Sequence, residues 1–274
     1  MVKHRFALIV FMIPLIGCKG NAMNPLDTAY RRLREVPQRK WDSLAQKKVF
    51  FGHQSVGRNV IEGLEKVLLS VPSIRLRIEE TAEPGDFQAP VFAHSRIGQN
   101  RDPRGKIDHF RRLLESGIGQ AVDVAFFKLC YVDVDRSTDI EGLVDHYDKT
   151  LAELAQTYPN LVLLPATVPL TNETPGIKAK IKRILGRGPA LKADNAKRNL
   201  INDHIRKKYG TAIWDLADAE TTTAQGGNTA VRDSRGTIYL MNPEYTIDGG
   251  HLNAIGSQIV AIDLLLRLVS LDPH

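Results

Sequence analysis

The feature that most constrains the fold is a regular alternation of short apolar runs with amphipathic stretches of helical spacing. Residues 47–52 form an apolar run, and residues 57–71 then place Val60, Leu64 and Val67 on one face of a helix. Apolar strands that alternate with helices are typical of a parallel sheet covered on both faces. The chain is therefore predicted to be a three-layer α/β/α sandwich around a central, mostly parallel sheet. The predicted strands are 47–52, 73–80, 121–134, 161–169 and 212–220, and the predicted helices are 57–71, 105–117, 140–159, 193–210 and 253–269.

The first 17 residues are predicted to be a cleaved export signal that takes no part in the fold. Lys3 and Arg5 form a basic start, residues 6–16 are apolar, and Cys18 follows directly after Gly17. This apolar run is shorter than the roughly 20 residues that a membrane-spanning helix needs. The ending Leu-Ile-Gly-Cys resembles the lipobox of bacterial lipoproteins, which implies cleavage before Cys18 and lipidation of its sulfur. The alternative is an ordinary signal peptide followed by a chance cysteine.

Lipidation of Cys18 implies a protein of the bacterial cell envelope, anchored to a membrane outside the cytoplasm. Lys19 follows it in place of an Asp, which in lipoproteins favours the outer membrane where the host has two. Cys130 is then the one remaining cysteine, expected as a small buried hydrophobe without a disulfide partner. Lys3 and Arg5 are removed with the signal, so 35 of the 37 basic residues remain. With 31 acidic residues, the net charge of the mature chain is +4. This mild charge does not indicate a nucleic-acid partner.

The rest of the chain is predicted to be a tether with a short helix over residues 18–46, followed by one domain over 47–274. Two stretches do not fit the alternation of strands and helices. Residues 177–188 are strongly basic and are predicted to be either a solvated helix or a lid that attracts acidic polysaccharide. Residues 221–250 form a long irregular approach to the last helix, and long loops of this kind often carry function.

Ser55 lies just past the first predicted strand and at the start of a helix. Ligands gather at the carboxyl ends of the strands in an open parallel sheet. The first turn of a helix also has unpaired N–H groups and a positive partial charge, which suit a developing oxyanion. Ser55 is therefore a candidate nucleophile, and the alternative is the common role of a serine that caps a helix.

A second candidate motif precedes the last helix, where Asp248 lies three residues before His251. A carboxylate this close can bond one imidazole nitrogen, fix the tautomer, and leave the other nitrogen to accept a proton from a hydroxyl. Alone, the motif also fits an ordinary polar loop. Together with Ser55 it indicates a Ser-His-Asp triad.

The residues around these positions resemble the SGNH hydrolases, the GDSL-like esterase and lipase superfamily, over residues 47 to about 271. The first family block appears as Phe-Phe-Gly-His-Gln-Ser-Val-Gly and the last as Asp-Gly-Gly-His-Leu-Asn-Ala-Ile-Gly. The resemblance implies a flavodoxin-like fold, with Ser55 as nucleophile, His251 as base and Asp248 as orienting acid. In the second block, His-Ser-Arg-Ile-Gly-Gln-Asn, it implies that the backbone N–H of Gly98 joins that of Ser55 in the oxyanion hole. Asn100 is a further candidate oxyanion donor.

The third family block, Gly-x-Asn-Asp, should follow the most apolar strand, but this chain has Lys-Leu-Cys-Tyr-Val-Asp-Val-Asp there. Asn100 or Lys128 is the candidate to replace the missing Asn. Lys128 is unusual on an apolar strand, and it either pairs with Asp133 or Asp135 or extends to solvent. Lys128, Asp133 and His53 are candidate substrate-binding residues, with a packed turn histidine as the alternative for His53.

Other catalytic classes fit the sequence less well. The α/β-hydrolase elbow is Gly-x-Ser-x-Gly, and here His53 stands at its first Gly position. The eight histidines form no His-x-x-x-His or cysteine-rich set, so neither a metal nor another cofactor is predicted.

The sequence thus predicts a lipid-anchored serine esterase outside the cytoplasm that removes acetyl or other short acyl groups from carbohydrate. One alternative is an O-acyltransferase that acts on a cell-envelope or secreted polysaccharide, because the same acyl-enzyme passes its acyl group to a sugar hydroxyl instead of water. The other is a glycan-binding lipoprotein that has kept the fold with a decayed site.

Overall fold

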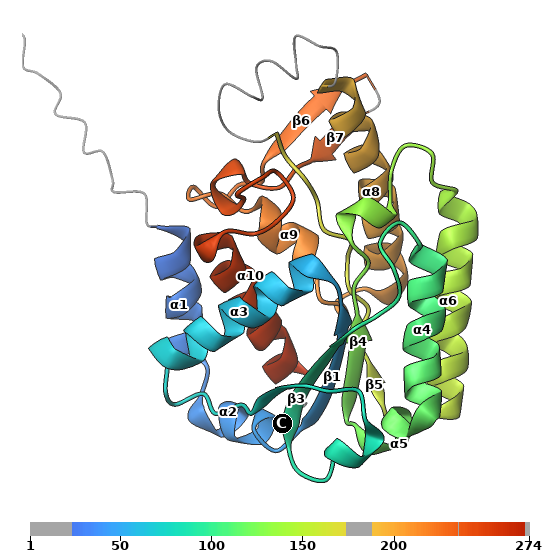
Figure 1. The fold of residues 1–274 in the computed structure, drawn as a ribbon. Coiled ribbons are helices and arrows are strands. Elements are labelled where there is room, and N and C mark those ends of the chain that lie inside the picture. Colours follow the sequence, from blue (N-terminus) through green and yellow to red (C-terminus); the bar gives the residue numbers. More distant parts are fainter. Residues whose placement is uncertain (1–23, 174–187, 235, 272–274) are drawn as a thin grey trace, which may run out of the picture.

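The computed structural model describes residues 24–173, 188–234 and 236–271. A parallel sheet lies at its centre, with helices on both faces (Figure 1). The middle strand pairs on both sides, so that Val49 lies beside Phe92 and Val124. The predicted three-layer α/β/α sandwich is therefore confirmed. In spatial order the strands are β2 (Ile78–Glu80), β3 (Val91–Arg96), β1 (Lys48–His53), β4 (Val124–Phe127) and β5 (Val162–Leu163).

The chain changes direction across the sheet at β1. It leaves β1 to build β2 and β3 on one side and later adds β4 and β5 on the other. Without the short edge strand β2, this is the start of the flavodoxin-like order. Ligands in such sheets bind beyond the carboxyl end of the strand where the order reverses, and that strand here leads directly to Ser55.

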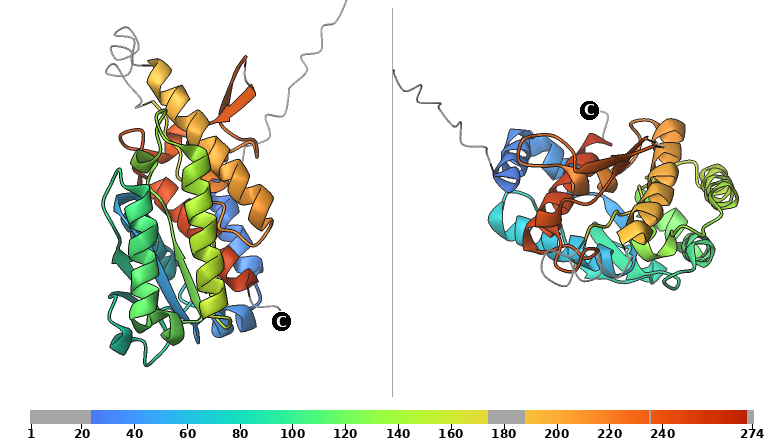
Figure 2. Two further views of the ribbon diagram at one scale, coloured as in Figure 1. Left: turned by 90° about the vertical axis from the view of Figure 1, so that its right-hand side faces the viewer. Right: turned by 90° about the horizontal axis from the view of Figure 1, so that it is seen from above.

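Alternate residues of the three central strands, β3, β1 and β4, enter two separate cores. In β1, Val49 and Phe51 belong to one core and Phe50 belongs to the other. This period of two is the geometry of a strand buried on both faces, and Figure 2 shows the helical layers from two further sides. The first core is covered by α1 (Pro25–Glu35), α2 (Gln38–Leu44), α3 (Ser55–Ser70), α9 (Leu216–Thr221) and α10 (Ala254–Ser270). The second is covered by α4 (Pro103–Leu113), α6 (Ile140–Thr157) and α8 (Gly188–Tyr209), with the short π-helical turn η2 (Leu114–Ile118) and α5 (Gly119–Ala121).

The predicted short helix before β1 is present, and a second helix follows it. The segment before β1 thus forms α1 and α2, and Ala29, Leu33, Trp41 and Leu44 are buried in the same core as β1. The amphipathic pattern of this segment thus packs against the domain, chiefly against α10, instead of standing apart from it. Cys18 and the predicted signal lie outside the described residues.

Three further stretches differ from the sequence prediction. The predicted strand 212–220 keeps one parallel bridge, from Trp214 to Ala166, and then becomes α9. β3 was not predicted, and the region 221–250 contains a hairpin of β6 (Ala230–Asp233) and β7 (Gly236–Tyr239). Most of the predicted basic segment 177–188 lies outside the described residues.

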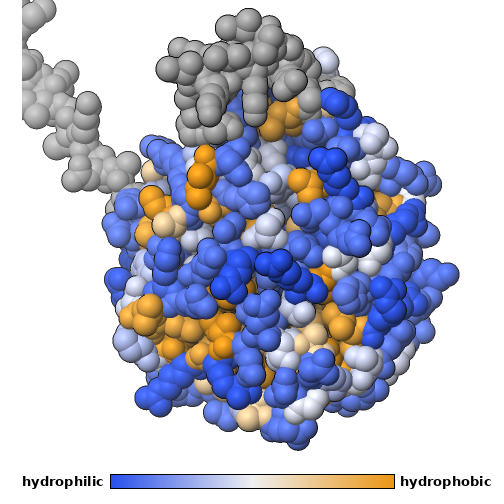
Figure 3. All heavy atoms as spheres, viewed as in Figure 1, coloured by the Kyte–Doolittle hydropathy of each residue, from blue (hydrophilic) through white to orange (hydrophobic). Residues whose placement is uncertain are grey.

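The face of the molecule in Figure 3 is mainly hydrophilic, and its hydrophobic residues form separate patches. Among the described residues, no helix combines the length and the hydropathy needed to cross a bilayer.

Candidate active site

Ser55 is the first residue of α3, directly after the turn that ends β1. Gln54 holds the N-cap position, and its side-chain amide donates to the carbonyl oxygens of Ile97 and Gly98, both at 2.9 Å. The Ser55 hydroxyl does not cap the helix, and it lies instead 3.1 Å from Nε2 of His251. The helix-cap alternative for Ser55 is therefore wrong.

Packing of α3 against α10 brings the two halves of the site together. Gly63 of α3 lies so close to the backbone of Ser257 in α10 that any side chain at Gly63 would collide with it. Ser55 starts α3, and His251 precedes Asn253, whose side chain caps α10. Close contact between these helices thus places the hydroxyl and the imidazole at the same end of the sheet.

Asp248 holds His251 in the orientation that a base needs. Its Oδ2 lies 2.7 Å from His251 Nδ1, and its Oδ1 accepts the backbone N–H of Gly250 (3.0 Å) and of His251 (2.8 Å). Burial acts to raise the pKa of Asp248, but these hydrogen bonds outweigh it and lower the pKa to about 2. The carboxylate is therefore ionised at neutral pH and fixes the proton of His251 on Nδ1, which leaves Nε2 to accept the proton of Ser55.

His53 does not face the site and is not available to bind substrate. Its ring is buried, with Nδ1 2.9 Å from the carbonyl oxygen of Gln54 and Nε2 3.0 Å from Nδ1 of His94. Burial lowers the pKa of His53 to about 3, so the ring is neutral. Gly57 is required here because any side chain at this position would collide with the His53 ring. The packed-histidine alternative is correct.

The buried pair of His53 and His94 is expected to make the protein less stable in acid. Burial lowers the pKa of His53 from 6.5 to about 3 and also lowers the pKa of His94. The unfolded chain thus binds more protons between these pH values, and the free energy of unfolding falls as the pH drops through this window. The expected slope is up to about 1.4 kcal/mol per pH unit for each histidine. Urea denaturation across the window should show a shallower slope for His53→Gln than for the wild type, and equal slopes would contradict this explanation.

Gly98 is not an oxyanion donor in this structure, contrary to the resemblance. Its backbone N–H donates to Nδ1 of His109 at 2.8 Å. Burial, and then the charge of Arg112, lower the pKa of His109, so its ring is neutral and can accept. Glycine is required at position 98 because φ is +53° and because a side-chain carbon would lie 2.8 Å from Cα of Lys106. The backbone N–H of Ser55 remains open, with no acceptor among the described residues.

Asn100 remains a candidate second donor. Its Oδ1 accepts a hydrogen bond from Nζ of Lys106 at 3.1 Å, which leaves its two amide N–H groups to donate elsewhere. The same Nζ pairs with Oδ2 of Asp133 at 2.5 Å, and both side chains are fully buried. Asp133 also accepts the backbone N–H groups of Arg101 and Cys130, at 2.7 and 2.6 Å. Asp133 also lines the cavity beside the site, and its bonds to Lys106, Arg101 and Cys130 hold together the loops there.

Lys128 makes neither of the contacts predicted for it. Its side chain is buried, with Nζ 3.4 Å from the carbonyl oxygen of Leu129 and 3.7 Å from Sγ of Cys130. Asp133 is paired with Lys106 instead. Lys128 therefore neither forms the predicted ion pair nor reaches solvent, and it contributes no donor to the oxyanion hole or to substrate binding.

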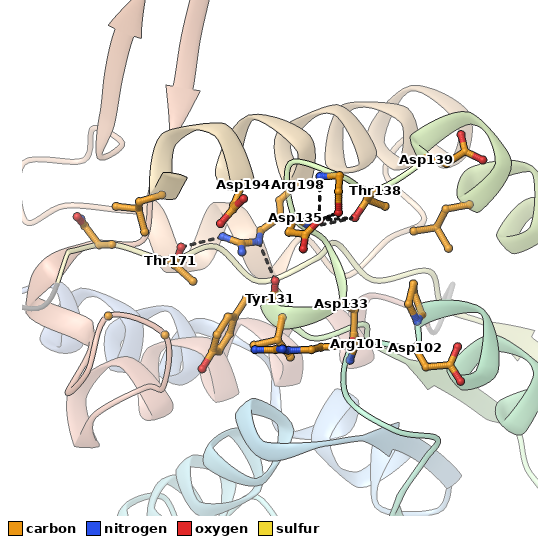
Figure 4. A pocket seen from close by; sticks show the side chains of 18 of the residues that line it. Arg101, Asp102, Tyr131, Asp133, Asp135, Thr138, Asp139, Thr171, Asp194 and Arg198 are labelled. Carbon is orange, nitrogen blue, oxygen red and sulfur yellow. Dashed lines mark hydrogen bonds between the residues drawn. The ribbon is translucent and has the colours of Figure 1, made fainter. Parts of the chain in front are cut away.

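A cavity of about 860 Å³ lies beside the triad, bounded by Asp248 and Gly250. Tyr131 lines this cavity (Figure 4). Its ring also makes a T-shaped contact with that of His251, with the ring centroids 5.7 Å apart, and lies close to Gly250. The cavity also reaches Arg198 of α8.

Sequence reasoning missed several residues that shape the site, namely Gln54, Lys106, Tyr131 and Arg198. Gln54, directly before Ser55, ties this turn to the loop after β3. A lysine on the apolar face of a helix is a sequence signal from which Lys106 could have been identified. Among the described residues no group of three or more His, Cys, Asp or Glu side chains is arranged to hold a metal ion.

Comparison with known proteins finds no matching family model and no match among curated protein sequences. Solved structures do show similarity. A candidate platelet activating factor from Streptococcus pneumonia has a TM-score of 0.48 and 16% identity, with 89% of this chain and 91% of that one covered. A lipolytic protein of the G-D-S-L family from Desulfitobacterium hafniense has a TM-score of 0.44 and 9% identity, covering 81% and 99%. The periplasmic domain of a lipopolysaccharide acetyltransferase from Salmonella ser. Paratyphi A has a TM-score of 0.45 and 12% identity, covering 89% and 95%.

Proposed function

We propose that this protein is a serine esterase of the SGNH type. The single observation that carries the proposal is the continuous hydrogen-bonded relay at the carboxyl end of β1. Ser55 Oγ lies 3.1 Å from His251 Nε2, and His251 Nδ1 lies 2.7 Å from Asp248 Oδ2. Both distances are within the range of a catalytic hydrogen bond.

In the first step, Ser55 Oγ attacks the ester carbonyl while His251 Nε2 takes the hydroxyl proton. Asp248 stabilises the imidazolium that forms. The negative oxygen of the tetrahedral intermediate is stabilised by the Ser55 backbone N–H at the start of α3 and by the side-chain amide of Asn100. Collapse of the intermediate breaks the ester bond, and His251 returns the proton to the leaving alcohol.

In the second step, a water attacks the acyl group on Ser55, again with its proton taken by His251. The products are a carboxylic acid and the restored serine. The substrates proposed are acetyl or other short acyl esters of carbohydrate, in a protein anchored outside the cytoplasm through lipidated Cys18. The cavity beside His251 favours a second candidate, transfer of the acyl group to a sugar hydroxyl bound there.

The proposal is tested by hydrolysis of 4-nitrophenyl acetate and butyrate, together with labelling by a fluorophosphonate that reacts with activated serines. Turnover and a single adduct on the peptide that contains Ser55 are expected. An adduct on another serine, or no turnover of either aryl ester or of acetylated oligosaccharides, would rule the proposal out. Addition of an unacetylated oligosaccharide separates transfer from hydrolysis, because only transfer gives an acetylated acceptor.

Asn100→Ala is expected to lower kcat by about 10²-fold with little change in KM, because the amide contacts the oxyanion and not the ground-state ester. Steady-state kinetics with 4-nitrophenyl acetate measures this. The neighbouring substitution Gln99→Ala is the matched control and is expected to leave kcat unchanged. Equal losses in the two variants would show that Asn100 is not the second donor.

A further inference from the structure

Arg198 is a buried cation at the cavity, and no carboxylate of the described residues lies within ion-pair distance of it. Its Nε donates to the carbonyl oxygens of Tyr131 and Val134, at 3.0 and 3.1 Å. Its Nη1 donates to the side-chain oxygens of Thr171 and Asn195, at 2.7 and 2.8 Å. All four acceptors are neutral. The remaining nitrogen, Nη2, has no hydrogen-bond partner among the described residues and belongs to a side chain that lines the cavity (Figure 4).

A buried charge is costly unless an opposite charge contacts it. Burial lowers the pKa of Arg198 to about 10, although Asp194 and other nearby charges act to raise it. The guanidinium remains protonated at neutral pH, so it is a preorganised donor that lacks an anion. Arginine binds carboxylates with short, charge-assisted hydrogen bonds.

A second guanidinium reaches the same cavity. Arg101 is exposed, and none of the described residues forms an ion pair with its side chain. Its backbone has φ of 69°, which is uncommon outside glycine, and the 2.7 Å bond from its N–H to Asp133 holds it there. Figure 4 shows the Arg101 and Arg198 side chains entering the cavity from different elements, with Tyr131 beside them.

The aspartates around the cavity are already engaged by the protein. Asp102 and Asp139 cap α4 and α6, and Asp194 accepts the backbone N–H of Arg136. Asp135 likewise accepts hydrogen bonds within its own turn, from Ser137 and Thr138. The exposed Glu173 lies at the rim, where solvent screens its charge. Arg104 also lines the cavity and lies 4.0 Å from Asp139. Among the described lining residues, Arg198 and Arg101 are therefore the arginines without an ion-pair partner.

We infer that Arg198 and Arg101 form a subsite for a carboxylate on the sugar part of the substrate, so that the enzyme acts on acylated acidic sugars. This inference rests on the proposed function. A cavity of about 860 Å³ exceeds the needs of a short acyl chain and suits one or more sugar rings. The leaving alcohol receives its proton from His251, and Tyr131, whose ring contacts that of His251, lines this cavity, so the inference places the sugar there.

The test measures binding apart from catalysis. Full-length Ser55→Ala protein is titrated calorimetrically with an ester-free tetragalacturonate and with the same oligosaccharide after reduction of its carboxylates to alcohols. The acidic form is expected to bind at least tenfold more tightly, and added salt is expected to weaken it. Arg101→Gln should weaken binding of the acidic form about tenfold, and Arg198→Lys at least as much. Arg75→Gln, an exposed arginine away from the cavity, is the matched control and should change nothing.

Equal binding of the acidic and reduced forms, or equal effects of Arg101→Gln and Arg75→Gln, would overturn the subsite. Because Arg101 supports no buried contact through its side chain, its variant remains informative if Arg198→Lys folds poorly. An Arg101-dependent preference of the active enzyme for 4-nitrophenyl hemisuccinate over the acetate would instead assign the carboxylate to the acyl group and overturn its placement on the sugar. Carboxylate binding without any esterase activity would refute the proposed function and leave the subsite standing. Esterase activity without carboxylate binding would refute the subsite and leave the proposed function standing.

Discussion

Replacement of Ser55 by alanine is expected to lower kcat for ester hydrolysis by roughly 10⁴-fold or more, because no other group can form the acyl-enzyme. His251→Ala should have a comparable effect, and the double variant should be little worse than either single one. This non-additivity is expected because the two side chains act as one unit through the 3.1 Å contact between Oγ and Nε2. Stopped assays with 4-nitrophenyl acetate measure the loss.

Stability measurements on the same variant separate the catalytic role from a structural one. A serine that caps a helix stabilises the protein by about 1 kcal/mol relative to alanine. Ser55 does not occupy the cap position of α3, so Ser55→Ala should unfold at nearly the same urea concentration as the wild type. Ser70→Ala, at the other end of α3, is the matched control and should retain activity. Substantial esterase activity in Ser55→Ala would refute the nucleophile assignment.

The positions of Ser55, Asp248 and His251 are readable from sequence because each depends on short-range pattern. Asp248 and His251 are three residues apart, so the turn alone brings them into contact. Ser55 directly follows a strand of a predicted parallel sheet, and ligands bind at the carboxyl ends of such strands. Ser55 and His251 are far apart in the sequence. They come into contact because α3, which begins at Ser55, packs against α10, which begins just after His251.

The errors in the predicted secondary structure have local physical causes. Residues 212–220 are apolar enough for a buried strand, but Asp215 accepts the backbone N–H of Asp218 and so starts a buried helix instead. A hydrophobic run alone does not distinguish these two structures. In β3, the apolar start is followed by His94, Ser95 and Arg96, which conceal a strand whose partners bury only its first part.

The oxyanion region could not be predicted because its contacts join residues far apart in the chain. Gly98 matches the family position, yet its N–H is taken by His109, eleven residues away. The pair of Lys106 with Asp133 spans 27 residues and crosses from α4 to the loop after β4. The spacing of the two residues in the sequence does not indicate that they pair. The chain thus brings Ser55, His251 and Asp248 together, and a buried ion pair, not a family motif, holds the side chain of Asn100.

The buried ion pair of Lys106 and Asp133 is expected to contribute strongly to stability. Lys106→Met is expected to lower the free energy of unfolding by about 3–5 kcal/mol, because it leaves Asp133 charged and buried without its partner. The remaining bonds to the backbone N–H groups of Arg101 and Cys130 do not neutralise that charge. Urea denaturation measures the change. Lys66→Met, an exposed lysine on α3, is the matched control and should change stability by no more than about 0.5 kcal/mol.

A double-mutant cycle separates the charge from the packing. Asp133→Asn removes the charge and keeps one side-chain oxygen, which can accept one of the two backbone N–H groups that Asp133 binds. Lys106→Met combined with Asp133→Asn should therefore recover part of the stability that Lys106→Met alone loses. The double variant should still show a reduced kcat, because Asn100 has lost the ammonium that holds its Oδ1. Full activity in a stable double variant would show that the pair supports only the fold. A Lys106→Met protein as stable as Lys66→Met would show that Asp133 is not charged in the folded state.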